Sequence, residues 1–288
     1  GVTPRLRVVD GAGWDGMGPE GAPACLRESL SVASGPSCEV VVITGSPLRI
    51  VFRSHHGIMD GRGTLTWAED IFRALRGEPV TGSDPMLCEY DLLNISKGKI
   101  ERAISYLYGA PTGRATGTGG GLTWRRVIAG GCYSSLLPKV MICVARQVWK
   151  FSDENARFGI SVDMRSRGEG LRTTNNLTNA FYIDFGPDMK YDELGRIISR
   201  RQYNREDGTF TLEDRLICHT PLSLLAFIMK REVQAHHRSG MYRYSAFVSN
   251  MGRVNVQPFS GGGFTATVFW GIPPGLGMVP LFLGEKDG

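Results

Sequence analysis

The sequence lacks the features that mark several large classes of protein. Its six cysteines form no Cys-x-x-Cys pair, and none stands near a histidine at the spacing of a zinc site. No apolar run reaches the roughly 18 residues that a membrane-spanning helix needs, and no secretory signal is visible at the first residues. These absences favour a protein of a reducing, cytoplasmic compartment, with no metal and no membrane partner.

Charge is also sparse, and its two signs are nearly balanced. Lysine and arginine total 33 against 28 acidic residues, and charged residues make up 21% of the chain. The densest basic groups are pairs, Arg125-Arg126 and Arg200-Arg201, whereas a nucleic-acid-binding protein gathers basic residues in runs or on one face. We therefore expect no nucleic-acid partner. Arginine outnumbers lysine, and because arginine binds phosphate in a bidentate way, a phosphate-bearing substrate is compatible with the composition.

Length and composition favour two subdomains. The chain has 288 residues, of which 42% are apolar, enough for a sizeable core. The Gly/Thr-rich stretch 109–121 lacks the Gly-Lys-Ser/Thr ending of a phosphate-binding loop, so we interpret it as a linker. We expect an N-terminal lobe of residues 1–108 and a C-terminal lobe of residues 122–288.

Apolar periodicity predicts strands and helices that alternate along the chain. Runs of β-branched residues at 39–44 and 48–54 flank a Gly-Ser-Pro turn and predict a hairpin. Helical spacing follows over 65–75 and is stopped by Gly77. This order is typical of an α/β or layered α+β fold. Further helices are predicted at 136–148, 192–205 and 221–238, and further strands near 158–162, 181–185, 244–249, 264–270 and 279–283.

Two adjacent histidines lie between the predicted hairpin and the helix, in the run His55-His56-Gly57-Ile58-Met59-Asp60-Gly61. A neutral imidazole can take a proton from an attacking alcohol or amine. A thioester is already activated, so acyl transfer from it needs a base and no enzyme nucleophile. We expect Gly57 and Gly61 to permit a strained turn and close approach of a substrate. Asp60 could orient the imidazole, or point away and pair with an arginine that braces the loop.

Two other interpretations of the histidine pair stay open at this point. A shared metal ion is one, but adjacent side chains that leave a strand diverge, and zinc would need a third and a fourth ligand. The other is a pair of loop histidines that make hydrogen bonds to the backbone. The flanking glycines and Asp60 favour a catalytic role for His56.

The same seven residues resemble the His-His-x-x-x-Asp-Gly signature of the condensation domains of nonribosomal peptide synthetases. That superfamily includes chloramphenicol acetyltransferase and the carnitine and plant alcohol acyltransferases. The resemblance implies His56 as the catalytic base, His55 as a supporting residue and Asp60 in a structural salt bridge. It implies two chloramphenicol-acetyltransferase-like lobes with a tunnel between them. Only 54 residues precede the motif, fewer than in members of the family, so we expect the first lobe to be N-terminally incomplete.

Two downstream segments extend the resemblance. Val162-Asp163-Met164-Arg165 ends a predicted strand, where the family often places an arginine that faces the aspartate of the motif. Arg165 is therefore the candidate partner of Asp60. The segment 247–252 is similar to a strand-end Ser-Asn-x-Gly of acyltransferase relatives, and this similarity implies Ser249 or Asn250 as support for the oxyanion.

The activity that the resemblance implies is formation of an ester or amide. An acyl thioester would be the donor, carried by CoA or by the phosphopantetheine of an acyl or peptidyl carrier protein, and a small alcohol or amine would accept. No permanently bound cofactor is implied. Two relatives of the same fold stay open: a non-catalytic platform that docks carrier proteins, and an epimerase-type enzyme that inverts an aminoacyl centre.

Overall fold

A computed structural model describes most of the chain. The described residues are 4–83, 87–89, 91–92, 100–101, 107–114, 116, 123–131, 133–206, 210–211, 216–217, 219–272 and 279–286. The expected linker 109–121 lies partly outside them, and the proposed division into lobes stays a prediction. No helix in these ranges combines the length and the apolar character that a bilayer crossing requires.

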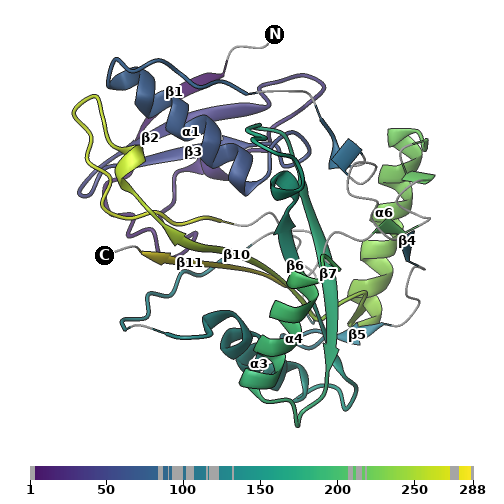
Figure 1. The fold of residues 1–288 in the computed structure, drawn as a ribbon. Helices are drawn as coiled ribbons and strands as arrows, with labels where there is room; N and C mark the ends of the chain where they lie inside the picture. Colours follow the sequence, from purple (N-terminus) through teal and green to yellow (C-terminus); the bar gives the residue numbers. More distant parts are fainter. Residues whose placement is uncertain are drawn as a thin grey trace.

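The first layered unit is a three-stranded sheet with one long helix against it (Figure 1). Its elements are β1 (Arg5–Asp10), β2 (Cys38–Thr44), β3 (Arg49–Ser54) and α1 (Gly61–Leu75). β2 lies in the centre, parallel to β1 and antiparallel to β3. The helix packs on the sheet through Phe52, whose ring centroid lies 5.6 Å from Trp67 and 6.0 Å from Phe72. The predicted hairpin and helix are confirmed.

The opposite face of this sheet is covered by the loop that follows β1. Val41 and Ile43 point to this face and pack with the buried Trp14. Glu39 shares the same face because side chains alternate along a strand. Its fully buried carboxylate accepts hydrogen bonds from Arg5 and Arg53, which satisfy a charge that would otherwise be costly to bury.

The second unit is a four-stranded sheet in the order β11-β10-β6-β7. Its elements are α3 (Leu136–Val148), β6 (Ala156–Asp163), β7 (Thr178–Phe185), α4 (Tyr191–Tyr203), β10 (Ala246–Val254) and β11 (Val279–Lys286). β6 and β7 are antiparallel, whereas β10 runs parallel to both of its neighbours. Apolar side chains of α3 and α4 pack with the strands in one core, in which Phe158 stacks on Phe185 at 5.4 Å.

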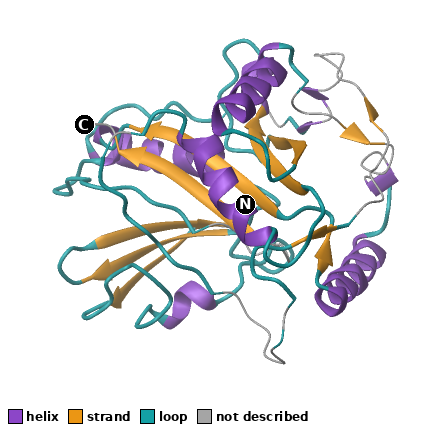
Figure 2. Ribbon diagram, turned by 90° about the horizontal axis from the view of Figure 1, so that it is seen from below, coloured by secondary structure: helices purple, strands orange, loops and turns teal. Residues whose placement is uncertain are grey.

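The remaining described elements lie outside these two units, and Figure 2 shows the strands in separate groups with helices beside them. They are η1 (Ala24–Arg27), β4 (Ile100–Glu101), β5 (Tyr108–Gly109), η2 (Met164–Arg167), β8 (Phe210–Thr211), α6 (Leu222–Ser239), β9 (Met241–Tyr242) and η3 (Gln257–Phe259). The chain after β10 reaches the first unit, where Arg76 of the helix end donates to the carbonyl oxygen of Pro258 at 2.9 Å.

One expected strand was wrong, and the sequence analysis did not predict the strand β1. The predicted strand near 264–270 has no strand partner among the described residues, and only an isolated bridge joins Phe264 to Gly261. Its alternating pattern reflects side-chain packing, as in the contact of Phe269 with Phe259, and such a pattern needs a partner strand to make a sheet. The strand β1 was not expected. Its apolar residues Leu6 and Val8 are 67% and 66% exposed, so its pattern does not mark a buried face.

We predict that Phe158→Ala lowers the free energy of unfolding by about 3–5 kcal/mol, because it empties the centre of the second core. Phe158 is fully buried, whereas Phe151 is 60% exposed and is a matched control. Phe151→Ala is expected to cost less than about 1 kcal/mol. Urea unfolding of both variants measures the difference, and equal costs would contradict this assignment of the core.

Candidate active site

The motif aspartate, Asp60, is a buried carboxylate at the start of α1. It is the N-cap of the helix, and its side chain accepts a hydrogen bond from the backbone N–H of Gly63 at 2.7 Å. Only 1% of the residue is exposed. A carboxylate at this position accepts a hydrogen bond from one of the unpaired backbone N–H groups of the first turn. Its negative charge also interacts favourably with the positive end of the helix dipole. Asp60 therefore fixes where the helix begins.

The structure brings Asp60 together with Arg165, which lies in η2 directly after β6. The two guanidinium nitrogens of Arg165 donate to the two carboxylate oxygens at 3.0 and 3.1 Å. The carboxylate also accepts from the backbone N–H of Leu177 at 2.7 Å and from the hydroxyl of Thr178 at 2.9 Å. With the bond from Gly63 it accepts five hydrogen bonds. The pair joins the two layered units.

The arginine side of the pair is equally well satisfied. Arg165 also donates to the carbonyl oxygen of Thr173 at 3.0 Å and to the carboxylate of Asp163 at 2.8 Å. Burial alone would lower the pKa of Arg165, but the hydrogen bonds and negative charges of Asp60 and Asp163 outweigh it and raise the pKa. The guanidinium therefore stays charged, and the geometry meets the condition under which a buried ion pair persists.

His56 lies in the turn between the end of β3 and Asp60. Its backbone carbonyl accepts a hydrogen bond from the side-chain amide of Asn176 at 2.8 Å. Its ring Nδ1 is buried and has no hydrogen-bond partner among the described residues. The ring of His55 is used differently, because its Nδ1 accepts from the backbone N–H of Gly57 at 3.1 Å. The adjacent histidines thus have different environments: His55 braces the turn, and His56 is held through its backbone.

The expectation of a strained turn at Gly57 and Gly61 was wrong. Neither residue has a positive φ, so a side chain could adopt either backbone conformation. The position that requires glycine is Gly63, at which a Cβ would overlap the carbonyl oxygen of Thr174 and stand 3.0 Å from that of Asn175. The helix start and the segment before β7 pack backbone against backbone here, and this close approach places Asn176 against the histidine turn.

The two oxyanion candidates lie on β10, which passes beside the motif. The sulfur of Met251 lies 3.6 Å from where a Cβ on Gly61 would stand. Ser249 is half-buried and makes no side-chain hydrogen bond to the part of the chain that the structure describes. The side chain of Asn250 is exposed and accepts from the backbone N–H of Gly252 at 3.0 Å. An oxyanion role for either residue stays a prediction.

Sequence reasoning missed Asn176, Gly63 and Thr178. Asn176 and Thr178 lie in the polar run Thr173–Thr178, whose only visible signal is that it follows Arg165 and precedes a strand. Asn176 is 120 residues from His56, and nothing in their local patterns relates the two. Gly63 is one of three glycines in or next to the motif, and only the packing distinguishes it from the others.

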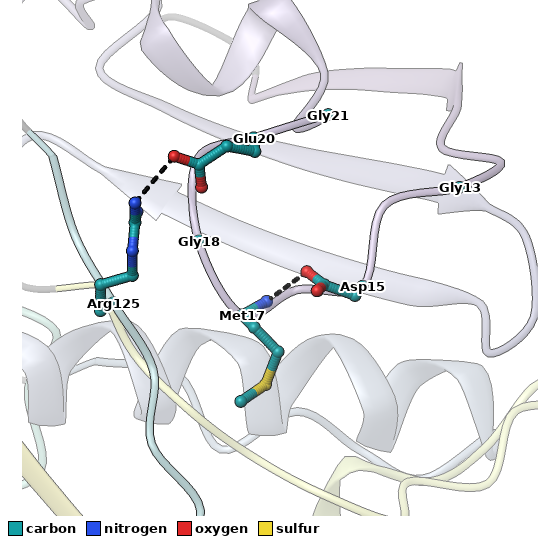
Figure 3. Close-up of a pocket in the computed structure, with 7 residues that line it drawn as sticks. All are labelled: Gly13, Asp15, Met17, Gly18, Glu20, Gly21 and Arg125. Carbon is teal, nitrogen blue, oxygen red and sulfur yellow. Dashed lines mark hydrogen bonds and ion pairs between the residues drawn. The ribbon is translucent and has the colours of Figure 1, made fainter.

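A cavity of about 480 Å³ lies away from the motif, beside the loop 13–21 (Figure 3). It is lined by this loop and Arg125, and Figure 3 shows Arg125 reaching across to Glu20. The lining includes no histidine and no residue of the motif, so we do not assign the chemistry to it. The tunnel between lobes that the sequence resemblance implies stays a prediction.

Comparisons with known proteins agree with this geometry at the level of the fold. No protein-family model and no curated protein sequence matches the chain. Among solved structures, it is similar to the starter condensation domain of the rhizomide synthetase RzmA, with a TM-score of 0.50 and 14% identity, over 100% of this chain and 70% of that one. For a C8-CoA complex of the same starter domain, the TM-score is 0.46 and the sequence identity 14%. The match covers 91% of this chain and 64% of the starter domain.

The acyltransferase TRI101 of F. sporotrichioides, solved with coenzyme A and T-2, gives a TM-score of 0.49 and 14% identity over 91% of this chain and 68% of that one. At a TM-score of 0.50, the likeness to the starter condensation domain shows that the chain has a condensation-domain-like fold. The fold expected from the histidine motif is confirmed.

We predict that Asp60→Ala lowers the free energy of unfolding by about 3–5 kcal/mol, because it removes the buried carboxylate that holds Arg165 and leaves Asp163 as the remaining charge partner of the buried guanidinium. The control is Glu20→Ala, which removes an exposed ion pair with Arg125 and should cost less than about 1 kcal/mol. Chemical denaturation measures both. A cost for Asp60→Ala as small as that of the control would show that the pair does not hold the units together.

A second prediction separates the glycines of the motif region. Gly63→Ala should destabilise the protein by about 1–3 kcal/mol, since the new methyl group would collide with the backbone at Thr174. Gly61→Ala meets only the sulfur of Met251 at an ordinary contact distance and should change stability little. Thermal unfolding of the two variants distinguishes the positions, and a reversed order would contradict the described packing.

Proposed function

We propose that the protein is an acyltransferase that forms an ester or amide from an acyl thioester, with His56 as its general base. The observation that carries the proposal is the placement of His56. It follows the end of the hairpin strand β3, in a turn held by Asn176 and ended by the Asp60–Arg165 pair. A base must be held in one position relative to its substrate, and this turn is fixed on both sides.

In the proposed reaction His56 moves one proton twice. Its Nδ1 is buried without a described partner, and we assign the proton transfer to Nε2. Nε2 takes the proton of the acceptor hydroxyl or amine as that group attacks the thioester carbonyl. The tetrahedral intermediate then collapses, the carbon–sulfur bond breaks, and the leaving thiolate receives the proton from the imidazolium. One ester or amide and one free thiol result, with no covalent enzyme intermediate.

Negative charge on the carbonyl oxygen needs donors that are already in place. We assign this role to the backbone on the Gly57 side of the turn, with support from Ser249. Two features support the assignment of Ser249: β10 passes beside Gly61, and the hydroxyl of Ser249 is not engaged by any described residue. Asn250 is the alternative donor on the same strand, although its side chain is exposed and hydrogen-bonds to Gly252.

The donor we propose is a thioester of phosphopantetheine, carried by CoA or by an acyl or peptidyl carrier protein. Solved structures that are similar in fold include a condensation domain with C8-CoA and an acyltransferase with coenzyme A, and these ligands support the donor class. The acceptor is a small amine or alcohol. We further propose a reducing, cytoplasmic compartment; Cys25, Cys38 and Cys143 form no disulfide with the described part of the chain.

The experiment is thiol release from a panel of acyl-CoA and acyl-carrier thioesters with mixed amine and alcohol acceptors. Wild type should release thiol in an acceptor-dependent way, and His56→Ala should lower the rate by about 10²-fold or more, as expected on loss of a general base. His237→Ala is the control, because His237 is an exposed histidine that contacts Tyr242 outside the motif.

The other outcomes are equally informative. Wild-type rates in His56→Ala would contradict the role of the base. Binding of a carrier protein without turnover, in both proteins and on the whole panel, would favour a docking platform. Inversion of a single aminoacyl thioester without any acceptor would identify an epimerase-type enzyme.

A further inference from the structure

Three tryptophans gather on the face of the first sheet that is opposite to α1. Trp14 is buried, and its ring centroid lies 6.3 Å from that of Trp124 and 6.0 Å from that of Trp270. The half-buried pair Trp124 and Trp270 lies closer, at 5.4 Å. The three come from distant parts of the chain, so this cluster closes only in the folded protein.

Two arginines lie on this cluster. The guanidinium carbon of Arg49 is 5.2 Å from the ring centroid of Trp14, and that of Arg126 is 5.0 Å from the ring centroid of Trp270. The two sites are adjacent, because a Cβ on Gly16 would stand 3.1 Å from Nε of Arg49 and also 3.3 Å from the ring of Trp270. Two positive charges therefore share one small surface.

Neither arginine has a carboxylate partner among the described residues. Within the described chain, the hydrogen bonds of the Arg49 side chain go to the backbone carbonyl oxygens of Pro47, at 3.2 Å, and Asp15, at 3.0 Å. The side chain of Arg126 makes no hydrogen bond or ion pair with the described chain. Burial and the positive charge of Arg49 both lower the pKa of Arg126. This contrasts with Arg165, whose charge is fully compensated.

The surroundings limit where an anion can bind. The nearby cavity of Figure 3 is lined by Asp15 and Glu20, whose carboxylates repel an anion there. Arg125 lines the same cavity, but it is already paired with Glu20 at 2.8 Å. Among the described residues at this cluster, Arg49 and Arg126 are the arginines that no carboxylate engages, and both guanidinium groups lie on the tryptophans.

We propose that Arg49 and Arg126 form a binding site for a phosphate ester. A phosphate carries two or more acceptors and close to two negative charges, and guanidinium groups bind it through paired, charge-assisted hydrogen bonds. The half-buried faces of Trp124 and Trp270 offer a surface on which a nucleobase can stack. The ligand is a nucleotide, either free or as the phosphate-bearing end of CoA.

This site is separate from the chemistry at His56. Arg49 begins β3 and the histidine turn follows its end, so five residue steps of extended strand place the two about 17 Å apart. The phosphate therefore anchors a ligand without taking part in proton transfer. The proposal goes beyond the acyltransferase function and does not require it.

Titration of intrinsic tryptophan fluorescence tests the site directly, since three of the five tryptophans belong to it. The probes are inorganic phosphate, AMP, ADP, dephospho-CoA and CoA. Arg49→Gln and Arg126→Gln should each raise the Kd of ADP and CoA by about tenfold or more, because each removes charge-assisted hydrogen bonds. Arg126→Lys should bind with intermediate affinity. Arg125→Gln is the matched control, and its Kd should stay within about twofold of wild type.

Circular dichroism checks that each variant is folded, and the same titration in His56→Ala should give the wild-type Kd. Equal affinity for ADP and CoA identifies a nucleotide site. A preference for CoA over dephospho-CoA identifies the phosphate-bearing end of the acyl donor. No binding of any probe up to about 1 mM, or an unchanged Kd in both glutamine variants, would overturn the proposal. Because binding is measured without turnover, a failure of acyl transfer leaves this result interpretable.

Discussion

The buried ion pair between Asp60 and Arg165 is the interaction on which the rest of the site depends. Asp60 fixes the first turn of α1 in one unit, and Arg165 follows β6 in the other. Their mutual hydrogen bonds, with those from Leu177 and Thr178, set the distance between the two units. The histidine turn has one end on β3 and the other on Asp60, so the position of His56 follows from this pair.

Arginine has two distinct uses in this molecule. Arg165 and Arg53 each donate to a buried carboxylate. Water does not reach that carboxylate, so the arginine is needed to stabilise its charge and the role of the pair is structural. Arg49 and Arg126 lie on aromatic rings with only backbone acceptors or none among the described residues. Arg165 is buried, whereas Arg53 is half-buried like Arg49 and Arg126, so burial alone does not separate the two uses and the available acceptors do. An arginine that no carboxylate of the described chain neutralises is the better candidate for binding an anionic ligand.

The sequence predicted the local elements around the motif well and the contacts between units less well. The hairpin and α1 follow from β-branched runs and helical spacing, because these patterns are set by neighbouring residues. Arg165 was reached only through the resemblance to a family, since no local pattern links it to Asp60. Asn176 and Gly63 were missed for the same reason: their importance arises from backbone contact between segments far apart in the chain.

Chemical rescue of His56→Ala tests the central claim most directly, because it asks whether an imidazole is all that the variant lacks. Acceptor-dependent thiol release should rise with added imidazole, and among substituted imidazoles it should rise with their basicity, as general-base catalysis requires. The same additions should leave wild type unchanged. Full activity of His56→Ala without imidazole would contradict the account, and so would acceptor-dependent turnover by wild type that no imidazole restores to the folded variant.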